Sequence, residues 1–262
     1  MSFEQLLRDA YSDCIKEFLE DNRREPSEGI HVSEILTCLR RSYLYTTKPV
    51  EVTPNYSLFS GVVIHRAIED IICKKIEKLA KERYDLKSEV IHETEITDGI
   101  LVGTPDIVVV LGDIVYVLEL KTTKYHPVSI IENYKRAKSS PRGLDVFRNN
   151  LEKILVAMHD KYIKQTQIYM SMLKKQGYKD IRGYIVYVRR TDGKMKLDEV
   201  PYSEQTYKWA LNRADKLYRS YHTGEEPEPE PSILCSPYVD RETGKIISRC
   251  PYYDTCPVYR KI

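Results

Sequence analysis

Two apolar runs separated by a dipeptide constrain the fold of this chain more than any other feature. The runs IVVVL and IVYVL flank Gly112-Asp113, a dipeptide typical of two-residue β-hairpin loops. If these two residues form the turn, the strands pair residue by residue outward from it, and Asp106 lies opposite Glu119. Side chains alternate between the faces of a strand, so Lys121 shares the face of Glu119. The pattern predicts two carboxylates and an ammonium at one end of an apolar hairpin.

Both faces of this hairpin are apolar, which is typical of central strands covered on both sides. Two adjacent carboxylates at a buried strand end repel each other and are costly to desolvate. A divalent cation relieves both costs, and Mg²⁺ is typically held by one or two carboxylates, waters and phosphate oxygens. Lys121 would then act on an attacking water or on phosphate charge. The alternative is a structural ion pair at a sheet edge, and the spacing alone leaves both interpretations open.

Composition excludes several classes of protein. The 262 residues include 41 basic and 39 acidic side chains, and 42% of the chain is apolar, unlike a disordered polymer. No stretch approaches the about 18 uncharged apolar residues of a membrane span, and the first residues lack a signal-peptide pattern. We therefore expect a cytoplasmic protein with no membrane partner, built as one large domain or as one domain with an appendage.

The remaining elements follow from apolar periodicity. The helical period predicts helices over 1–25, 57–86, 161–176 and 203–224, the last between a Ser203 cap and a Gly224 stop. Ser33 is the expected N-cap of a further short helix that contains Cys38. Strands are expected over 88–96, 100–111, 113–121, 180–190 and 194–202. This order predicts an α/β (α+β) fold in which helices flank a central mixed sheet.

The chain has six cysteines, which fall into two groups. Cys14 and Cys73 lie in helical apolar patterns and are expected to be small buried hydrophobic residues. Cys38 and three others lie in polar surroundings near the two ends, where thiolates around a metal or cluster would give the tail something to fold around. No compact C-x2-C pair of the zinc-finger kind is present, and unrelated cysteines are the alternative. The three in the tail are Cys235, Cys250 and Cys256.

Four short motifs occur in a defined order: GVVIH, GTPD, ELK and QTQIY. Together they resemble the RecB-type branch of the PD-(D/E)xK nuclease superfamily. With the flanking cysteines, the chain resembles the fourth CRISPR-associated protein family, a set of RecB-like exonucleases with an iron–sulfur cluster. The resemblance spans about residues 31–259. The motif residues are His65, Asp106, Glu119, Lys121, Gln165 and Tyr169.

The resemblance implies a restriction-endonuclease-like core and a role for each matched residue. The residues implied to hold Mg²⁺ or Mn²⁺ are His65, Asp106, Glu119 and, through its carbonyl oxygen, Leu120. The residues that would complete the catalytic site are Lys121, as the catalytic lysine, with Gln165 and Tyr169. The resemblance also implies an iron–sulfur cluster, 4Fe–4S in preference to 2Fe–2S, and four thiolates suit such a cluster of either type. Its implied ligands are Cys38, Cys235, Cys250 and Cys256.

Three features depart from the family pattern. An insert over 236–249, which reads as a small hairpin, makes Cys235 the least certain cluster ligand. Tyr162 occupies a position ahead of the QTQIY motif where the family pattern would favour a histidine. The stretch over 122–160 is long and basic, and it is either a solvated surface or a wall of a DNA channel. Its basic residues are Lys124, Lys135, Arg136, Lys138, Arg142 and Arg148.

The family implies three segments: a helical one with the first cysteine (1–60), the nuclease core (61–222) and a linker with the cysteine tail (223–262). It also implies a metal-dependent exonuclease that acts on single-stranded DNA, with endonuclease activity as a further expectation. In this family the activity is linked to trimming CRISPR spacers, together with CRISPR integration proteins as partners. The oligomeric state is left open. The alternatives are a stand-alone RecB-like repair or mobile-element nuclease and a non-catalytic DNA-binding subunit. With a net charge of only +2, any DNA-binding surface must be a local groove beside Lys121.

Overall fold

The computed structural model describes residues 3–21, 29–50, 56–85, 87–92, 94–235, 238–239, 246–247 and 250–258. Within these residues, five strands form the central sheet in the order β2-β5-β6-β7-β8. Strands β6 and β7 pair in parallel, and the other neighbours pair antiparallel, so the predicted mixed sheet is confirmed. The strands are β2 (Ser88–His92), β5 (Ile107–Leu111), β6 (Ile114–Thr123), β7 (Asp180–Arg189) and β8 (Met195–Val200).

The predicted hairpin register is confirmed. Leu111 pairs with Ile114 around a turn in which Gly112 adopts a φ of +59°, a value that favours glycine. The last pair outward is Ile107 with Leu118. Asp106 therefore lies one residue beyond the paired strand, level with Glu119.

The expected continuous strand over 100–111 is wrong. Strand β4 (Leu101–Gly103) ends before Thr104-Pro105 and belongs to a separate small sheet with β1 (Ile30–His31) and β3 (Ile96–Asp98). Pro105 has no amide hydrogen to donate to a sheet and restricts the residue before it, which explains the break. The break frees Asp106 from the sheet and lets its side chain turn toward the end of β6.

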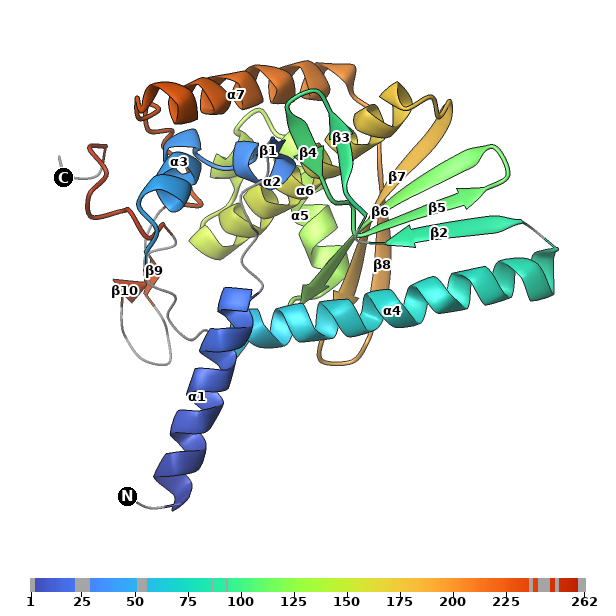
Figure 1. The fold of residues 1–262 in the computed structure, drawn as a ribbon, viewed down its shortest axis with the longest axis horizontal. Helices are drawn as coiled ribbons and strands as arrows, with labels where there is room; N and C mark the ends of the chain where they lie inside the picture. The colour runs from blue at the N-terminus through green and yellow to red at the C-terminus, as the bar shows by residue number, and fades with distance from the viewer. Residues whose placement is uncertain are drawn as a thin grey trace.

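Helices cover both faces of the central sheet (Figure 1). Helix α4 (Tyr56–Tyr84) covers the face that carries Ile107 and Val109, and α6 (Asn150–Lys175) covers the face that carries Val117. A Cβ at Gly183 of β7 would lie 2.5 Å from the sulfur of Met170, so the missing side chain lets α6 pack closely. The predicted arrangement of a mixed sheet flanked by helices is confirmed.

The other elements lie around this core. Helix α7 begins after Ser203, whose hydroxyl accepts a hydrogen bond from the Thr206 amide, and it ends at Gly224 with a φ of +74°, as predicted. Expected start points fail elsewhere: α6 begins at Asn150 rather than at residue 161. The other elements are α1 (Phe3–Asp21), α2 (Val32–Ile35), α3 (Leu39–Thr47), α5 (Pro127–Ser139), η1 (Gly143–Val146), α7 (Glu204–Thr223), β9 (Tyr238–Val239) and β10 (Ile246–Ile247).

Two predictions near the N-terminus need correction. Ser33 does not cap the helix of Cys38, because α2 already begins at Val32 and Cys38 is the N-cap residue of α3. Cys14 is exposed, whereas its neighbour Ile15 is buried, because adjacent residues of a helix point about 100° apart. Cys73 is buried in the apolar layer between α4 and the sheet, as predicted.

The acidic segment after α7 packs against α3. Tyr43 donates a hydrogen bond to the Gly224 carbonyl, Glu226 forms an ion pair with Arg40, and Glu230 accepts a 3.0 Å hydrogen bond from the Leu39 amide. A segment expected to act as a spacer therefore attaches the C-terminal tail to the N-terminal helices (Figure 1).

Strands β9 and β10 pair antiparallel, which agrees with the small hairpin expected over 236–249, although its turn lies outside the described residues. Among the helices that the structure describes, none is long and apolar enough to cross a membrane.

Candidate functional site

Asp106 is the centre of the candidate site. Its Oδ2 accepts a 2.7 Å hydrogen bond from the Leu120 amide and lies 3.3 Å from Lys121 Nζ. Lys121 also forms an ion pair with Glu119, which is fully buried. The structure thus brings together the two carboxylates and the ammonium that the hairpin register predicts.

His65 reaches this cluster from α4. Its Nε2 lies 3.6 Å from Asp106 Oδ2 and 3.5 Å from Oε2 of Glu69, one helical turn further along α4. One ligand atom from each of these three residues lies within 4.8 Å of the others, a spacing that can hold a metal ion. Sequence reasoning missed Glu69. The available signal was its position four residues after His65, on the same face of the helix.

Two buried carboxylate oxygens lack hydrogen bonds. Oε1 of Glu69 and Oε2 of Glu119 have no hydrogen-bond partner in the described part of the chain, and the two side chains are 3% and 0% exposed. Buried polar atoms without partners are rare and costly, so each calls for an explanation. A bound cation would supply the missing interaction, and these oxygen and imidazole ligands suit Mg²⁺ or Mn²⁺.

The implied ligand set differs in part from the observed grouping. Glu119 does not belong to the close group of His65, Glu69 and Asp106, because its carboxylate is paired with Lys121. The Leu120 side chain is buried among apolar residues, so only its backbone is available to the site.

Burial and neighbouring charges shift the pKa values of the site. Burial and the charge of Asp106 raise the pKa of Glu119 to about 7. Burial alone would lower the pKa of Lys121, but the carboxylates of Asp106 and Glu119 outweigh it and hold that pKa above its usual value. Burial also opposes the charge on His65, yet its hydrogen bonds to Asp106 and Glu69 raise the pKa to about 9. At neutral pH, the cations of His65 and Lys121 therefore lie among these carboxylates.

Gln165 and Tyr169 lie on the face of α6 turned toward the site. Gln165 Nε2 donates a 3.0 Å hydrogen bond to the Tyr169 hydroxyl. Burial and the charge of Glu119 raise the pKa of Tyr169, which places the hydroxyl in the field of the cluster. A Cβ at Gly103 would lie 2.6 Å from the Tyr169 ring, so the glycine of GTPD makes room for this tyrosine. Lys121 Nζ lies 5.1 Å from the centre of the Tyr162 ring.

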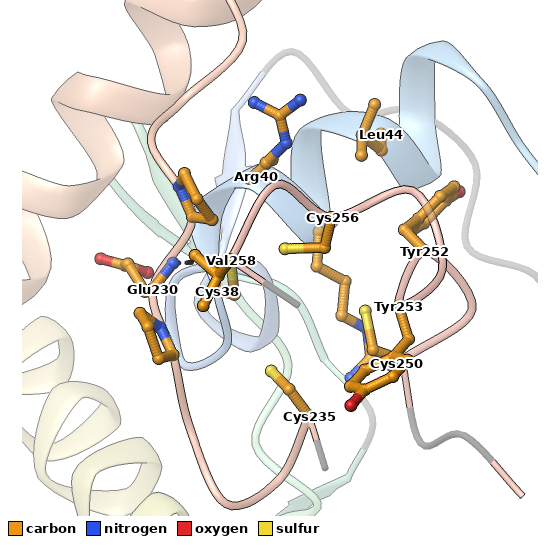
Figure 2. Close-up of a pocket in the computed structure, with 13 residues that line it drawn as sticks. Cys38, Arg40, Leu44, Glu230, Cys235, Cys250, Tyr252, Tyr253, Cys256 and Val258 are labelled. Atoms are coloured by element: carbon orange, nitrogen blue, oxygen red, sulfur yellow. Dashed lines mark hydrogen bonds between the residues drawn. The ribbon is translucent and has the colours of Figure 1, made fainter. Parts of the chain in front are cut away.

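The four cysteines at the two ends of the chain line one pocket (Figure 2). Cys38 comes from the turn between α2 and α3, and its sulfur accepts a 3.4 Å hydrogen bond from the Glu230 amide. Cys235 donates a hydrogen bond to Cys250, which lowers the pKa of Cys250 to about 6 and raises that of Cys235. The pocket therefore favours a thiolate. Cys256 completes the set, so the structure groups all four residues, including Cys235.

The spacing of these sulfurs does not match a single-ion site. Tetrahedral zinc with Zn–S bonds of about 2.3 Å places its sulfurs roughly 4 Å apart. Among the described residues, only the group of His65, Glu69 and Asp106 has ligand atoms within 4.8 Å of one another. The four cysteines do not form such a close group in the described structure, although the sulfurs of Cys235 and Cys250 are near enough to share a hydrogen bond.

Comparisons with known proteins give only distant likenesses. No family model matches the chain, and no curated protein does. The solved structure of the protein SSO0001 is 16% identical, with a TM-score of 0.47 over 99% of this chain and 97% of that one. An alkaline exonuclease from Laribacter hongkongensis is 12% identical, with a TM-score of 0.44 over 75% of this chain and 89% of that one. A candidate exonuclease from Eubacterium rectale is 12% identical, with a TM-score of 0.47 over 80% of this chain and 86% of that one. These TM-scores, all below 0.5, are too low to transfer an activity.

Proposed function

We propose that this chain is a metal-dependent deoxyribonuclease, a phosphodiester hydrolase that acts on single-stranded DNA from its ends. The observation that carries the proposal is the buried group of His65, Glu69, Asp106, Glu119 and Lys121. Three carboxylates lie together there, and two of them carry buried oxygens without hydrogen-bond partners among the described residues, an arrangement that a bound cation would stabilise.

The residues present fit Mg²⁺ or Mn²⁺, with Asp106, Glu119 and His65 as ligands and Glu69 within reach. When bound, the ion supplies Lewis-acid stabilisation of phosphate charge and a water of lowered pKa. The raised pKa of Lys121 keeps its ammonium charged at neutral pH, so it contributes positive charge toward the phosphate. Gln165 holds the Tyr169 hydroxyl in one orientation beside this centre.

We further propose that the cysteine pocket holds an iron–sulfur cluster, of the 4Fe–4S type. Four thiol groups line one pocket, and the family resemblance implies these four residues as cluster ligands. The cluster would join the α2–α3 turn to the C-terminal segment. Purified protein that contains iron and sulfide and absorbs broadly near about 400 nm supports this proposal, whereas colourless protein with one zinc would overturn it.

The activity is tested with single-stranded DNA labelled at the 5′ or the 3′ end. If the labelled strands become shorter in the presence of Mg²⁺ or Mn²⁺, but not after a chelator is added, the result supports the proposed nuclease activity. The matched pair of variants is Lys121→Ala, which removes the buried ammonium, and Lys208→Ala, which removes an exposed lysine of α7. Loss of cleavage in the first variant alone is expected, and equal activity in both would refute the role of Lys121.

The biological setting proposed is the trimming of CRISPR spacers, a step of antiviral defence, beside integration proteins. The family resemblance alone supports it. A gene located beside integration genes favours this setting, and a gene beside repair or mobile-element genes favours the stand-alone nuclease. A protein that binds DNA but no divalent metal would favour the non-catalytic DNA-binding subunit.

A further inference from the structure

A groove with a volume of about 1070 Å³ lies beside the candidate active site. One wall is formed by the turn after α2, the start of α3 and the segment over 230–235. The opposite wall is formed by α5 and α6, with α7 contributing Trp209 and Arg213. Tyr162 also lines the groove, and its ring centre lies 5.1 Å from Lys121 Nζ, so one side chain separates the groove from this lysine.

Three of the five basic residues that line this groove are paired with carboxylates of the protein. Lys138 and Lys164 lie 3.1 and 2.8 Å from the carboxylate of Asp160, and Arg213 forms an ion pair with Glu230. Among the basic residues of 122–160, Lys135 and Arg136 are paired with Asp198 and Glu152 as well. The sequence alone left open whether the stretch over 122–160 forms a DNA-binding wall. These ion pairs show that several of its basic side chains already contact carboxylates of the protein.

Arg41 and Lys161 are the exceptions. Both line the groove, Arg41 from α3 and Lys161 from α6, and neither forms an ion pair within the described parts of the chain. Burial, together with the positive charges of Arg41 and Lys121, lowers the pKa of Lys161 to about 8, while the charge of Glu119 opposes the shift. The two cations repel each other, and this repulsion is only partly offset, by the charge of Glu119 at Lys161 and by Cys250 near Arg41.

An anion between the two side chains would remove the repulsion. Lys161 lies four residues before Gln165 and eight before Tyr169, so all three project from one face of α6. One turn of helix separates neighbours of this set by about 6 Å along the axis. Lys161 is therefore one helical turn from Gln165, the nearest residue of the candidate active site on α6.

We propose that Arg41 and Lys161 bind a backbone phosphate of a single DNA strand that lies in this groove, next to the phosphate that is cleaved. The inference rests on the proposed nuclease function and gives it a substrate-binding site. The rings of Tyr134, Tyr162 and Trp209 line the same groove. Such rings suit unpaired bases, which stack on aromatic side chains, whereas the bases of a duplex are already stacked on each other.

The test measures DNA binding without cleavage, in buffer that contains no divalent ion. A fluorescent single-stranded oligonucleotide is titrated with wild type, Lys161→Gln, Lys161→Arg and Lys153→Gln at several salt concentrations. Lys153 is the matched control, because it lies on α6 but does not line the groove and is already paired with Asp145. Arg41→Gln is a supporting variant only, since Arg41 also lines the cysteine pocket.

Lys161→Gln is expected to bind about tenfold more weakly, because a charge-assisted contact is lost. The slope of log K against log salt should fall by about 0.7, the value for one phosphate contact on a single strand. Lys161→Arg should keep most of the affinity, and Lys153→Gln should equal wild type. Unchanged affinity and slope in Lys161→Gln would overturn the proposal.

Two further arms identify the source of the phosphate. A duplex of the same sequence should bind more weakly, and Lys161→Gln should change its binding little; an equal loss on the duplex would overturn the single-strand assignment. Inorganic phosphate should compete with the oligonucleotide only at high concentration. If phosphate binding depended on Lys161 while DNA binding did not, the assignment of the site to a DNA phosphate would be overturned. Since no metal is present, failure of this inference is distinct from failure of the nuclease, which is read from cleavage by wild type.

Discussion

Glu69 lies one helical turn after His65, with its Oε2 3.5 Å from His65 Nε2, while its Oε1 is buried without a hydrogen-bond partner in the described structure. This relationship places a third carboxylate at the predicted metal site. It also explains the raised pKa of His65, whose imidazolium lies between Glu69 and Asp106.

The first prediction concerns Glu69→Gln. Loss of this carboxylate charge beside His65 should weaken Mn²⁺ binding by about 10- to 100-fold, the usual cost of removing a supporting residue of a metal site. Glu77→Gln, on an exposed position of the same helix, is the control. Calorimetric titration with Mn²⁺ measures both, and equal affinities would show that Glu69 does not support the metal.

The second prediction concerns pH. Metal ligands must be deprotonated, and the pKa values of Glu119 and His65 are raised to about 7 and about 9. Protons therefore compete with the metal below these values, so metal affinity should rise from pH 6 to pH 9, with proton release on binding. Titrations in two buffers of different ionisation enthalpy measure the released protons. A pH-independent affinity without proton release would contradict this account.

The third prediction concerns Gly103. A methyl group there would meet the Tyr169 ring at 2.6 Å, so Gly103→Ala should lower the free energy of unfolding by about 1–3 kcal/mol, as overpacked sites do. Gly61→Ala in α4 is the control, since its added carbon would lie 3.7 Å from its nearest neighbour outside the helix, the Arg190 side chain. Urea denaturation compares the two. If both variants matched wild type, the close packing of Tyr169 on Gly103 would be refuted.

The fourth prediction separates the cysteines. Cys38→Ser and Cys250→Ser should lose iron and the absorption near about 400 nm, because each removes one implied cluster ligand. Cys14→Ser and Cys73→Ser should keep both, since these residues lie on α1 and α4, outside the pocket. Iron content per chain is the measurement. Full iron content in Cys38→Ser would exclude the proposed ligand set.

The sequence predicts local geometry well where one pattern determines it. The Gly112-Asp113 turn sets the register, and that register places Asp106 level with Glu119. The grouping of Cys38 with the tail came from the family resemblance, because no local pattern links residues nearly 200 positions apart.

Other features depend on contacts that no single segment encodes. Glu69 has an ordinary helical surface pattern, and only the approach of Asp106 reveals its role. The acidic segment around Glu226 reads as a spacer until Arg40 of α3 pairs with it. Lys161 has an ordinary helical pattern in the sequence, and only the folded groove shows that it forms no ion pair with the residues that the structure describes.

The most direct test of the central claim is Mn²⁺-dependent cleavage of single-stranded DNA by wild type, Asp106→Asn and Asp113→Asn. Both variants make the same change in the same hairpin, Asp106 at the buried end and Asp113 in the exposed turn. Wild type and Asp113→Asn should cleave equally, and Asp106→Asn should be slower by at least about 100-fold. Undiminished cleavage by Asp106→Asn, or no cleavage by wild type, would contradict the account.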